Sequence, residues 1–267
     1  MKVFISADIE GTALTTIWDE CYPQTKPASS ALAGRQMTLE VAAACEGAIA
    51  AGATEIFVKD AHSRGTNLDP NLLPGCVRII RGNSGSPWSM VYGIDESFDA
   101  AMFVGYHSAA GRCGNPLSHT ETTSTVWVKL NGVKCSEFRL YSWACALAKV
   151  PTVFLAGDQM LIDDSRDIHP RLRSVAVKDG MGGATVSLQP QSACNRIRAE
   201  AEKALRQPLS DALCTLPEDF TLEICYKEVK QAVTMSHFPG FTQVDDNTIR
   251  MHTKDYWEVL RAVMFVL

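Results

Sequence analysis

The chain has 267 residues, of which 46% are hydrophobic and 21% charged, and its formal net charge is -5 at pH 7. These values are ordinary for a folded globular protein. No stretch approaches the roughly 18 uninterrupted apolar residues of a membrane helix, and the lack of a Lys/Arg-rich block argues against a nucleic-acid surface.

The cysteines and the N-terminus indicate a cytoplasmic protein. Nine cysteines, an odd number, are scattered along the chain without a paired framework, which is typical of free thiols in a reducing compartment. The first residues show no basic region followed by a long apolar stretch, so we expect no signal peptide. We therefore expect a cytoplasmic protein that binds neither nucleic acid nor a membrane.

Short β-branched runs alternate with helix-like stretches from the N-terminus onward. The first strand is expected at residues 3–7, and the Ala-rich stretch 34–52 is expected to form a helix that stops at Gly52. Further strands are expected at 54–60, 77–80, 100–105, 152–158 and 174–179. This alternation favours an α/β fold with a mostly parallel sheet and helices on both faces.

A hairpin is expected within this series, at residues 125–135. Asn131-Gly132 stands there between two apolar runs, which is the strongest short signal for a β-hairpin. Ser136 follows as the expected N-cap of a helix that ends near Pro151.

The C-terminal part of the chain has a different pattern. A charged helix is expected at 199–206 and a last helix from Lys254. Between them lie three strand-like runs, TLEICYK, QAVTMS and TIRMHT. Consecutive strands of this kind suggest a smaller α+β unit. We expect a larger α/β domain at 1–190, which would be the metal-binding domain, and the smaller unit at 191–267. A discontinuous division of the chain is the alternative.

Acids and histidines follow three of the expected strands at the point where each strand ends. Asp8 and Glu10 come directly after the first strand, Asp60 and His62 end the second, and His107 closely follows another. The carboxyl ends of parallel strands form the edge at which such sheets bind ligands. Because buried carboxylates need a partner for their charge, three coincident strand ends favour a bound cation. The structural alternative is that Asp8 caps a turn and Glu10 is solvated.

Two further side chains extend this candidate site. His119 lies in the polar loop GNPLSHTET, soon after His107. Glu137 lies in the first turn of the helix that Ser136 begins, where the helix N-terminus could by itself explain an acid. Each residue alone is more often structural than catalytic.

Several segments together resemble one family, the zinc D-aminopeptidases associated with dipeptide-transport operons. The similar segments are SADIEGT, KDAHS, SMVYGIDESFDAAMFVGYHS, GNPLSHT and VPTVFLAGD, together with the acid at Glu137. The similarity runs to about residue 190 and reappears in FPGFTQVDDNTIRMHTKDYWEVLRAVM. The ordered combination of DIEG, DxHS and GYH is specific, although each motif alone is not.

The resemblance implies a site for two zinc ions per subunit. By resemblance, Asp8 bridges the two metals, Glu10 and His62 complete one site, and His107 and Glu137 complete the other. Three carboxylates and two neutral imidazoles carry a charge of -3, which two divalent cations and one shared hydroxide balance. Mixed nitrogen and oxygen ligands suit zinc.

The resemblance also implies roles beside the metals. His119 matches the family's S-H motif and is the expected catalytic residue, which would stabilise an oxyanion or carry a proton to the leaving amine. Asp60 is expected either to orient a ligand histidine or to bind a substrate amine. The family further implies a ring-like homo-oligomer with enclosed active sites, for which a decamer is one candidate.

The expected function is a dinuclear zinc aminopeptidase that releases N-terminal (D-)amino acids from short peptides or amides, with a water shared by the metals as the attacking group. Two alternatives stay open: a metal-dependent amidase or esterase for another small substrate, and a non-catalytic, metal-stabilised peptide-binding protein. Ser136 in place of the family's glycine, and Phe138 and Arg139 in place of less bulky residues, lie beside the site and leave the substrate preference open.

Overall fold

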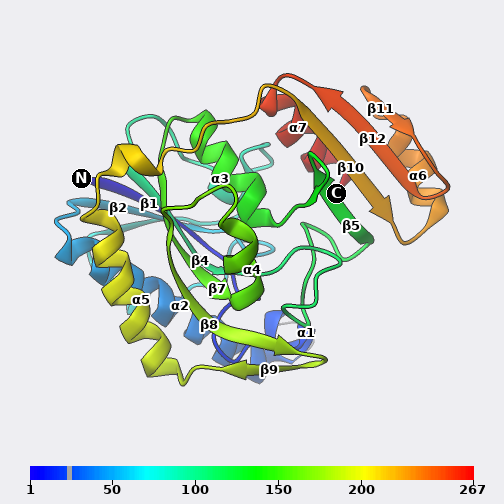
Figure 1. Ribbon diagram of the computed structural model, residues 1–267. Helices are drawn as coiled ribbons and strands as arrows, with labels where there is room; N and C mark the ends of the chain where they lie inside the picture. Colours follow the sequence, from blue (N-terminus) through cyan, green and yellow to red (C-terminus); the bar gives the residue numbers. More distant parts are fainter. Residues whose placement is uncertain (23–25) are drawn as a thin grey trace.

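The computed structural model describes residues 1–22 and 26–267. Among these residues, seven strands form the larger sheet in the order β3-β2-β1-β4-β7-β8-β9, and only the pairing of β8 with β9 is antiparallel. The strands are β1 (Lys2–Ala7), β2 (Glu55–Asp60), β3 (Val77–Ile80), β4 (Ala100–Tyr106), β7 (Thr152–Asp158), β8 (Arg173–Met181) and β9 (Ala184–Ser187). The prediction of an α/β fold with a mostly parallel sheet is confirmed (Figure 1).

Helices cover both faces of this sheet. The helices are α1 (Trp18–Cys21), α2 (Pro27–Ala50), α3 (Glu137–Leu147), α4 (Gln159–Ser165), α5 (Pro190–Leu205), α6 (Val229–Ser236) and α7 (Tyr256–Val266). Val3 and Ile5 belong to the apolar core shared with α2 and α5, whereas Phe4 belongs to the core shared with α3 and α4. Successive side chains of β1 thus enter opposite cores, as the period of a strand requires.

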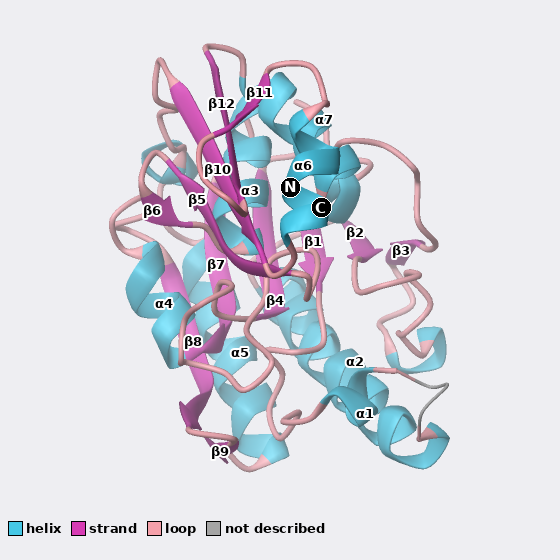
Figure 2. Cartoon of the chain, turned by 90° about the vertical axis from the view of Figure 1, so that its right-hand side faces the viewer, coloured by secondary structure: helices cyan, strands magenta, loops and turns pink. Residues whose placement is uncertain are grey.

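A second sheet joins strands from two distant parts of the chain. Its order in the described residues is β11-β12-β10-β5-β6, and every pairing is antiparallel. The strands are β5 (Thr125–Leu130), β6 (Val133–Lys134), β10 (Phe220–Tyr226), β11 (Phe241–Gln243) and β12 (Thr248–Thr253). Asn131 and Gly132, with φ of 53° and 79°, form the predicted hairpin turn. Figure 2 shows this sheet at the top of the molecule, beside α6 and α7.

The helix α7 joins the second sheet to α3. The Tyr256 hydroxyl in α7 donates a hydrogen bond to Leu140 O in α3 at 2.6 Å. Its ring lies 5.7 Å from that of Trp143 in α3 and 5.0 Å from that of Phe220 in β10. The position of α3 in the molecule therefore depends on residues near the C-terminus.

The division of the chain at residue 190 stays a prediction. The helix α5, which begins at Pro190, packs against α2 of the larger layer, whereas β5 and β6, which precede it, pair with the C-terminal strands. We therefore propose the discontinuous form of the division, in which residues 125–134 belong with residues 220–266.

One strand prediction is wrong, and two helices begin earlier than predicted. The run QAVTMS lies in α6, where Ala232 is buried and the helix packs against β11 and β12. Glutamine, alanine and methionine favour helix, and this packing decides the outcome. The helices α2 and α5 begin at Pro27 and Pro190, since proline is well accommodated in a first helical turn.

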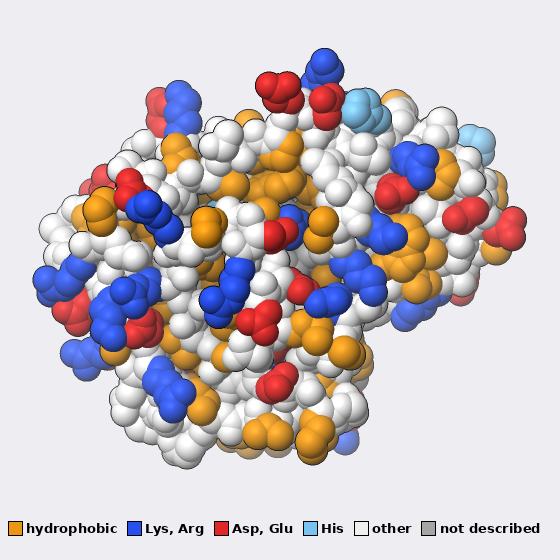
Figure 3. Space-filling model, in the orientation of Figure 1, with side chains coloured by type: hydrophobic (Ala, Val, Ile, Leu, Met, Phe, Trp, Pro, Cys, Tyr) orange, Lys and Arg blue, Asp and Glu red, His pale blue; other side chains and the backbone are white. Residues whose placement is uncertain are grey.

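The outer surface carries positive and negative side chains together. On the face shown in Figure 3, lysine and arginine side chains are interspersed with aspartate and glutamate. None of the helices in the described residues combines the length and apolar character needed to cross a membrane.

Candidate metal centre

The candidate ligands come from the middle of the larger sheet. The strand β1 lies between β2 and β4 and pairs with both in parallel. Asp8 and Glu10 follow β1, His62 follows β2, and His107 follows β4. Three neighbouring strands therefore bring these four side chains to one edge of the sheet, where open parallel sheets bind ligands.

Two glycines allow the segments after β1 and β4 to approach each other. Gly11 N donates a hydrogen bond to Gly105 O at 2.7 Å, and a Cβ at Gly11 would lie only 1.8 Å from Tyr106 O. Gly105 has φ of +79°, and a Cβ there would lie 2.0 Å from Asp8 O. Neither position accepts a side chain, which explains the glycines of the DIEG and GYH motifs.

Backbone carbonyls orient the three imidazoles of the site. The contacts are His62 Nε2 with Cys21 O at 3.2 Å, His107 Nδ1 with Ser108 O at 2.9 Å, and His119 Nδ1 with Leu117 O at 2.9 Å. Because a carbonyl only accepts hydrogen bonds, the ring nitrogen beside it carries a proton. The opposite nitrogen of each ring faces the carboxylates, and this is the nitrogen that a metal would bind.

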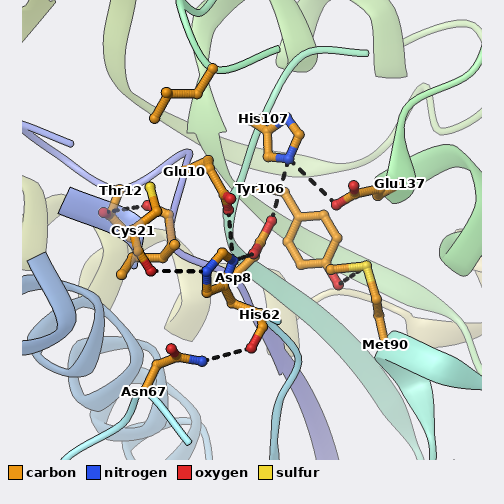
Figure 4. A network of polar contacts seen from close by, with 12 residues as sticks. Asp8, Glu10, Thr12, Cys21, His62, Asn67, Met90, Tyr106, His107 and Glu137 are labelled. Carbon is orange, nitrogen blue, oxygen red and sulfur yellow. Dashed lines mark hydrogen bonds and ion pairs between the residues drawn. The ribbon is translucent and has the colours of Figure 1, made fainter. Parts of the chain in front are cut away.

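Asp8, Glu10 and His62 form a first group of ligand atoms (Figure 4). His62 Nδ1 lies 3.1 Å from Glu10 Oε2 and 3.4 Å from Asp8 Oδ1. One ligand atom from each residue lies within 4.8 Å of the other two. A single cation could therefore contact all three side chains.

His107, His119 and Glu137 form a second group with the same spacing. His107 Nε2 lies 3.4 Å from Glu137 Oε2 and 3.6 Å from Asp8 Oδ2, so Asp8 faces both groups with its two oxygens. The rings of His107 and His119 stack with centroids 4.4 Å apart, and His119 Nε2 lies 3.5 Å from Glu137 Oε1.

Several buried polar atoms in these groups have no hydrogen bond within the described part of the chain. They are Asp8 Oδ2, both carboxylate oxygens of Glu10, and His107 Nε2. Such atoms are costly to bury without a partner, by roughly 1–3 kcal/mol each and more when charged. Divalent cations would satisfy them, and the carboxylate and imidazole donors match those that zinc takes in proteins. The residues present therefore fit bound zinc.

Without metal, burial and neighbouring charges displace the pKa values of these groups. Burial, followed by the charge of Glu10, raises the pKa of Asp8 to about 7. Burial alone would lower the pKa of His107, but the charge and hydrogen bond of Glu137, together with the charges of Asp8 and Glu10, outweigh it and the value rises to about 10. Burial opposes the charged form of His62 as well, but the charges and hydrogen bonds of Glu10 and Asp8 together outweigh it and raise the pKa of His62. A cation would displace protons from this cluster on binding.

The cap of α3 fixes the position of Glu137. Ser136 Oγ accepts a hydrogen bond from Arg139 N at 3.2 Å, as predicted for an N-cap. Glu137 is the first residue of the helix, and its Oε1 accepts a hydrogen bond from Glu121 N at 2.7 Å. Its Oε2 is then directed toward His107.

Asp60 holds the loop that carries His62. Its carboxylate accepts hydrogen bonds from Asn67 N, Asn67 Nδ2 and Leu68 N at 2.6, 2.8 and 2.9 Å. Asn67 Nδ2 also donates to His62 O at 2.7 Å. Asp60 acts on His62 through Asn67 and not through the imidazole ring. Its predicted part in metal or substrate binding stays a prediction.

A cavity of about 280 Å³ opens onto the cluster. Four acids and two histidines line it, namely Asp8, Glu10, Glu121, Glu137, His62 and His119. Neither lysine nor arginine is among the described lining residues. The residues Ser136, Phe138 and Arg139, which the sequence resemblance singled out as expected departures, do not belong to the described lining either. Arg139 instead pairs with Asp167 at 2.6 Å.

Sequence reasoning missed Glu121. This residue is partly buried, has φ of 61°, and accepts a hydrogen bond on Oε1 from the Tyr141 hydroxyl. Burial, followed by the charge of Glu137, raises its pKa to about 8 in the metal-free protein. Its place in the polar loop beside His119 was a signal that could have identified it.

The groups that hold the turn after β1 were also missed. Lys178 Nζ donates hydrogen bonds to Glu10 O and Thr15 O, and Asn115 Nδ2 donates to Glu10 O at 2.9 Å. Burial lowers the pKa of Lys178 to about 8. These contacts join residues more than 100 positions apart, so no local pattern could reveal them.

Comparison with known proteins places the chain in a family. The peptidase M55 family model, described as D-aminopeptidase, matches residues 1–265. The chain belongs to this family. The M55 chain is 26% identical over 266 residues to a D-aminopeptidase of Bacillus subtilis (strain 168), with 99% of this chain and 96% of the relative covered.

A solved structure resembles this M55 chain along its whole length. It is the Zn-dependent D-aminopeptidase DppA from Bacillus subtilis, described as a self-compartmentalizing protease. The TM-score is 0.89 at 25% sequence identity, with 100% of this chain and 96% of that chain covered. The family resemblance and the fold expected from the sequence are both confirmed.

Proposed function

We propose that this M55 protein is a zinc-dependent aminopeptidase that releases N-terminal D-residues from short peptides or amides. The observation that carries the proposal is the convergence of Asp8, Glu10, His62, His107 and Glu137 at one sheet edge, with buried ligand atoms left without hydrogen bonds in the described residues. The family and the zinc dependence of its solved relative support it.

Two zinc ions per chain are part of the proposal. One would be held by Glu10 and His62, the other by His107 and Glu137, and Asp8 would contact both through its two oxygens. When bound, zinc supplies Lewis acidity toward a peptide carbonyl and a water molecule. The three carboxylates supply most of the negative charge that two divalent cations need.

His119 is the proposed proton carrier. Leu117 O holds its Nδ1, so Nε2 points toward Glu137 and the cavity. The ring of Trp18 lies edge-on to the imidazole at 5.3 Å and limits its movement. From this position Nε2 can take a proton from the attacking water and pass it to the amine that leaves when the peptide bond breaks.

We further propose that the chain forms a homo-oligomer with enclosed active sites. The description of its solved relative as self-compartmentalizing supports this part of the proposal. A ring of ten chains and a cytoplasmic location stay predictions. Light scattering on the purified protein would give the number of chains directly.

The function is tested by metal analysis and a substrate panel. We expect close to two zinc ions per chain, hydrolysis of D-aminoacyl peptides or amides, loss of activity with a chelator, and recovery with zinc. Cleavage of esters or other amides without any D-aminoacyl substrate would favour the amidase or esterase alternative. Bound zinc without hydrolysis of any panel member would favour the peptide-binding alternative.

The ligand assignment is tested with His62→Ala. This variant is expected to lose zinc and at least about 100-fold in activity, because even groups that only support metal ligands typically contribute 10–100-fold. His237→Ala, at an exposed histidine after α6, provides the matched control. A His62→Ala protein with full zinc content and full activity would remove the assignment.

A further inference from the structure

A fourth acid stands beside the proposed metal ligands. Glu121 lines the cavity together with Asp8, Glu10 and Glu137, and its backbone N–H donates to Glu137 Oε1 at 2.7 Å. It belongs to neither of the two groups of potential ligands in the described residues. Its carboxylate is therefore next to the metal centre and available for another task.

The structure holds Glu121 in one conformation. Its φ of 61° is uncommon for a residue other than glycine and costs about 1 kcal/mol or more. Thr120 and Thr122 on either side pair in an isolated bridge, which makes the backbone a tight turn. The hydroxyl of Tyr141, a side chain that is only 1% exposed, donates to Oε1. Backbone and side chain are thus both fixed at the cavity.

Among the described residues that line the cavity, the histidines are the only side chains that could carry positive charge beside this carboxylate. Asp8, Glu10 and Glu137 would be neutralised by the metals that they hold. Neither lysine nor arginine is present among the described lining residues. A carboxylate in a small, partly buried cavity is stabilised by an opposite charge, and here a bound substrate is the source that remains.

We propose that the Glu121 carboxylate binds the N-terminal ammonium of the peptide substrate and so restricts cleavage to substrates with a free amine. This inference rests on the proposed aminopeptidase function. In a peptide, the α-nitrogen is two bonds from the first carbonyl carbon, so the group that binds it has to lie beside the metals. Glu121 lies there because its own backbone is hydrogen-bonded to Glu137.

The test compares a D-alanyl anilide that has a free amine with its N-acetyl derivative, using wild type and Glu121→Gln. Glutamine keeps the size of the side chain and an acceptor for Tyr141, but it carries no charge. We expect kcat/KM for the free amine to fall at least about tenfold, mainly through KM, as for the loss of one charge-assisted hydrogen bond. The rate for the acetylated compound and the zinc content are expected to stay unchanged.

A binding measurement gives a readout that is independent of turnover. D-Alaninol, which has the amine but no bond to cleave, is titrated into the zinc-loaded protein by calorimetry. Its affinity is expected to fall by a similar factor in Glu121→Gln, whereas N-acetyl-D-alaninol binds both proteins equally weakly. Equal affinity of D-alaninol for wild type and variant would overturn the inference.

Two further variants keep the result interpretable. Asn83→Ala removes a neutral side chain from the same cavity and is expected to preserve the preference for the free amine. Tyr141→Phe removes only the hydroxyl that holds Oε1, is expected to weaken the preference by a smaller factor, and carries the test if Glu121→Gln does not fold. If wild type cleaves neither compound, the proposed function is contradicted. If Glu121→Gln keeps the full preference for the free amine, this inference alone is overturned. Tyr141→Phe decides in the same way if Glu121→Gln does not fold.

Discussion

The imidazole nitrogens that face the carboxylates are selected by three backbone carbonyls, those of Cys21, Ser108 and Leu117. Each carbonyl accepts from one ring nitrogen and turns the other nitrogen toward the site. The ring orientations are therefore set by the protein before any metal binds. The orientation of the His62 ring depends on Cys21, the last residue of α1, a helix that otherwise contributes no candidate ligand.

The role of His119 distinguishes two arrangements of the site, one in which it carries protons and one in which it binds metal. As a proton carrier, it is expected to be dispensable for metal binding, so His119→Ala should retain its zinc while kcat falls roughly 10²–10⁴-fold. Zinc content and steady-state kinetics of the same preparation check this. His107→Ala provides the contrast and is expected to lose zinc and activity together. Loss of one zinc per chain from His119→Ala would instead make His119 a ligand.

At the scale of helices and strands, sequence patterns correctly predicted those turns, caps and strand ends that depend on local contacts. The Asn131-Gly132 turn, the Ser136 cap and the polar residues at the strand ends were all visible in the sequence, because each depends on neighbours along the chain. The helical state of QAVTMS depends on packing against β11 and β12, and a short amphipathic run fits either element. The contact of Lys178 with Glu10 O could not be predicted either, because it joins residues far apart in the sequence.

The helix α2 contains a buried acid that gives a separate prediction. Glu40 Oε1 accepts hydrogen bonds from Ala13 N and Gln36 Nε2, both at 2.8 Å. Its Oε2 has no hydrogen bond in the described part of the chain. Burial is the main cause that raises its pKa from 4.5 to about 7.

The raised pKa of Glu40 makes stability depend on pH. Between pH 4.5 and about 7 the folded state keeps a proton that the unfolded state has lost, so this group's contribution to stability falls as pH rises through that window. In Glu40→Gln that decline is expected to disappear, with a gain over wild type on the order of 2–3 kcal/mol above pH 7. Urea unfolding at pH 5 and pH 8 measures it.

Glu46→Gln is the control for this experiment. Glu46 is an exposed acid of the same helix, and its variant should keep the wild-type dependence of unfolding free energy on pH. A Glu40→Gln protein that declines in stability between pH 5 and pH 8 as steeply as wild type would contradict the assignment of a protonated, buried carboxyl.

In the whole molecule, the proposed metal centre would connect the two sheets. Asp8, Glu10, His62 and His107 come from the larger sheet, whereas Glu137 follows the hairpin that belongs to the second sheet. The pairing of β5 with β10 spans a long separation in sequence, and no short motif could predict it. A metal bound between these parts would therefore link them in the native state only.

Zinc is expected to stabilise the whole fold for this reason. A ligand at a thousand times its dissociation constant, bound by the native state alone, adds about 4 kcal/mol, which for a chain of this size raises the melting temperature by on the order of 10 °C. Calorimetry with and without a chelator measures the difference, and in His62→Ala the difference should shrink. Identical melting temperatures with and without chelator would show that the ions do not tie the sheets together.

The attachment of α3 to α7, and of the preceding hairpin to β10, has a consequence for biosynthesis. Glu137 opens α3, whose Leu140 carbonyl is hydrogen-bonded by Tyr256, and the preceding hairpin pairs with β10. A polypeptide still on the ribosome, with only residues 1–219 released, has neither of these supports. Hydrolytic competence thus has to wait until residues 220–256 have left the ribosome, and a shorter nascent chain is kept from acting on nearby peptides.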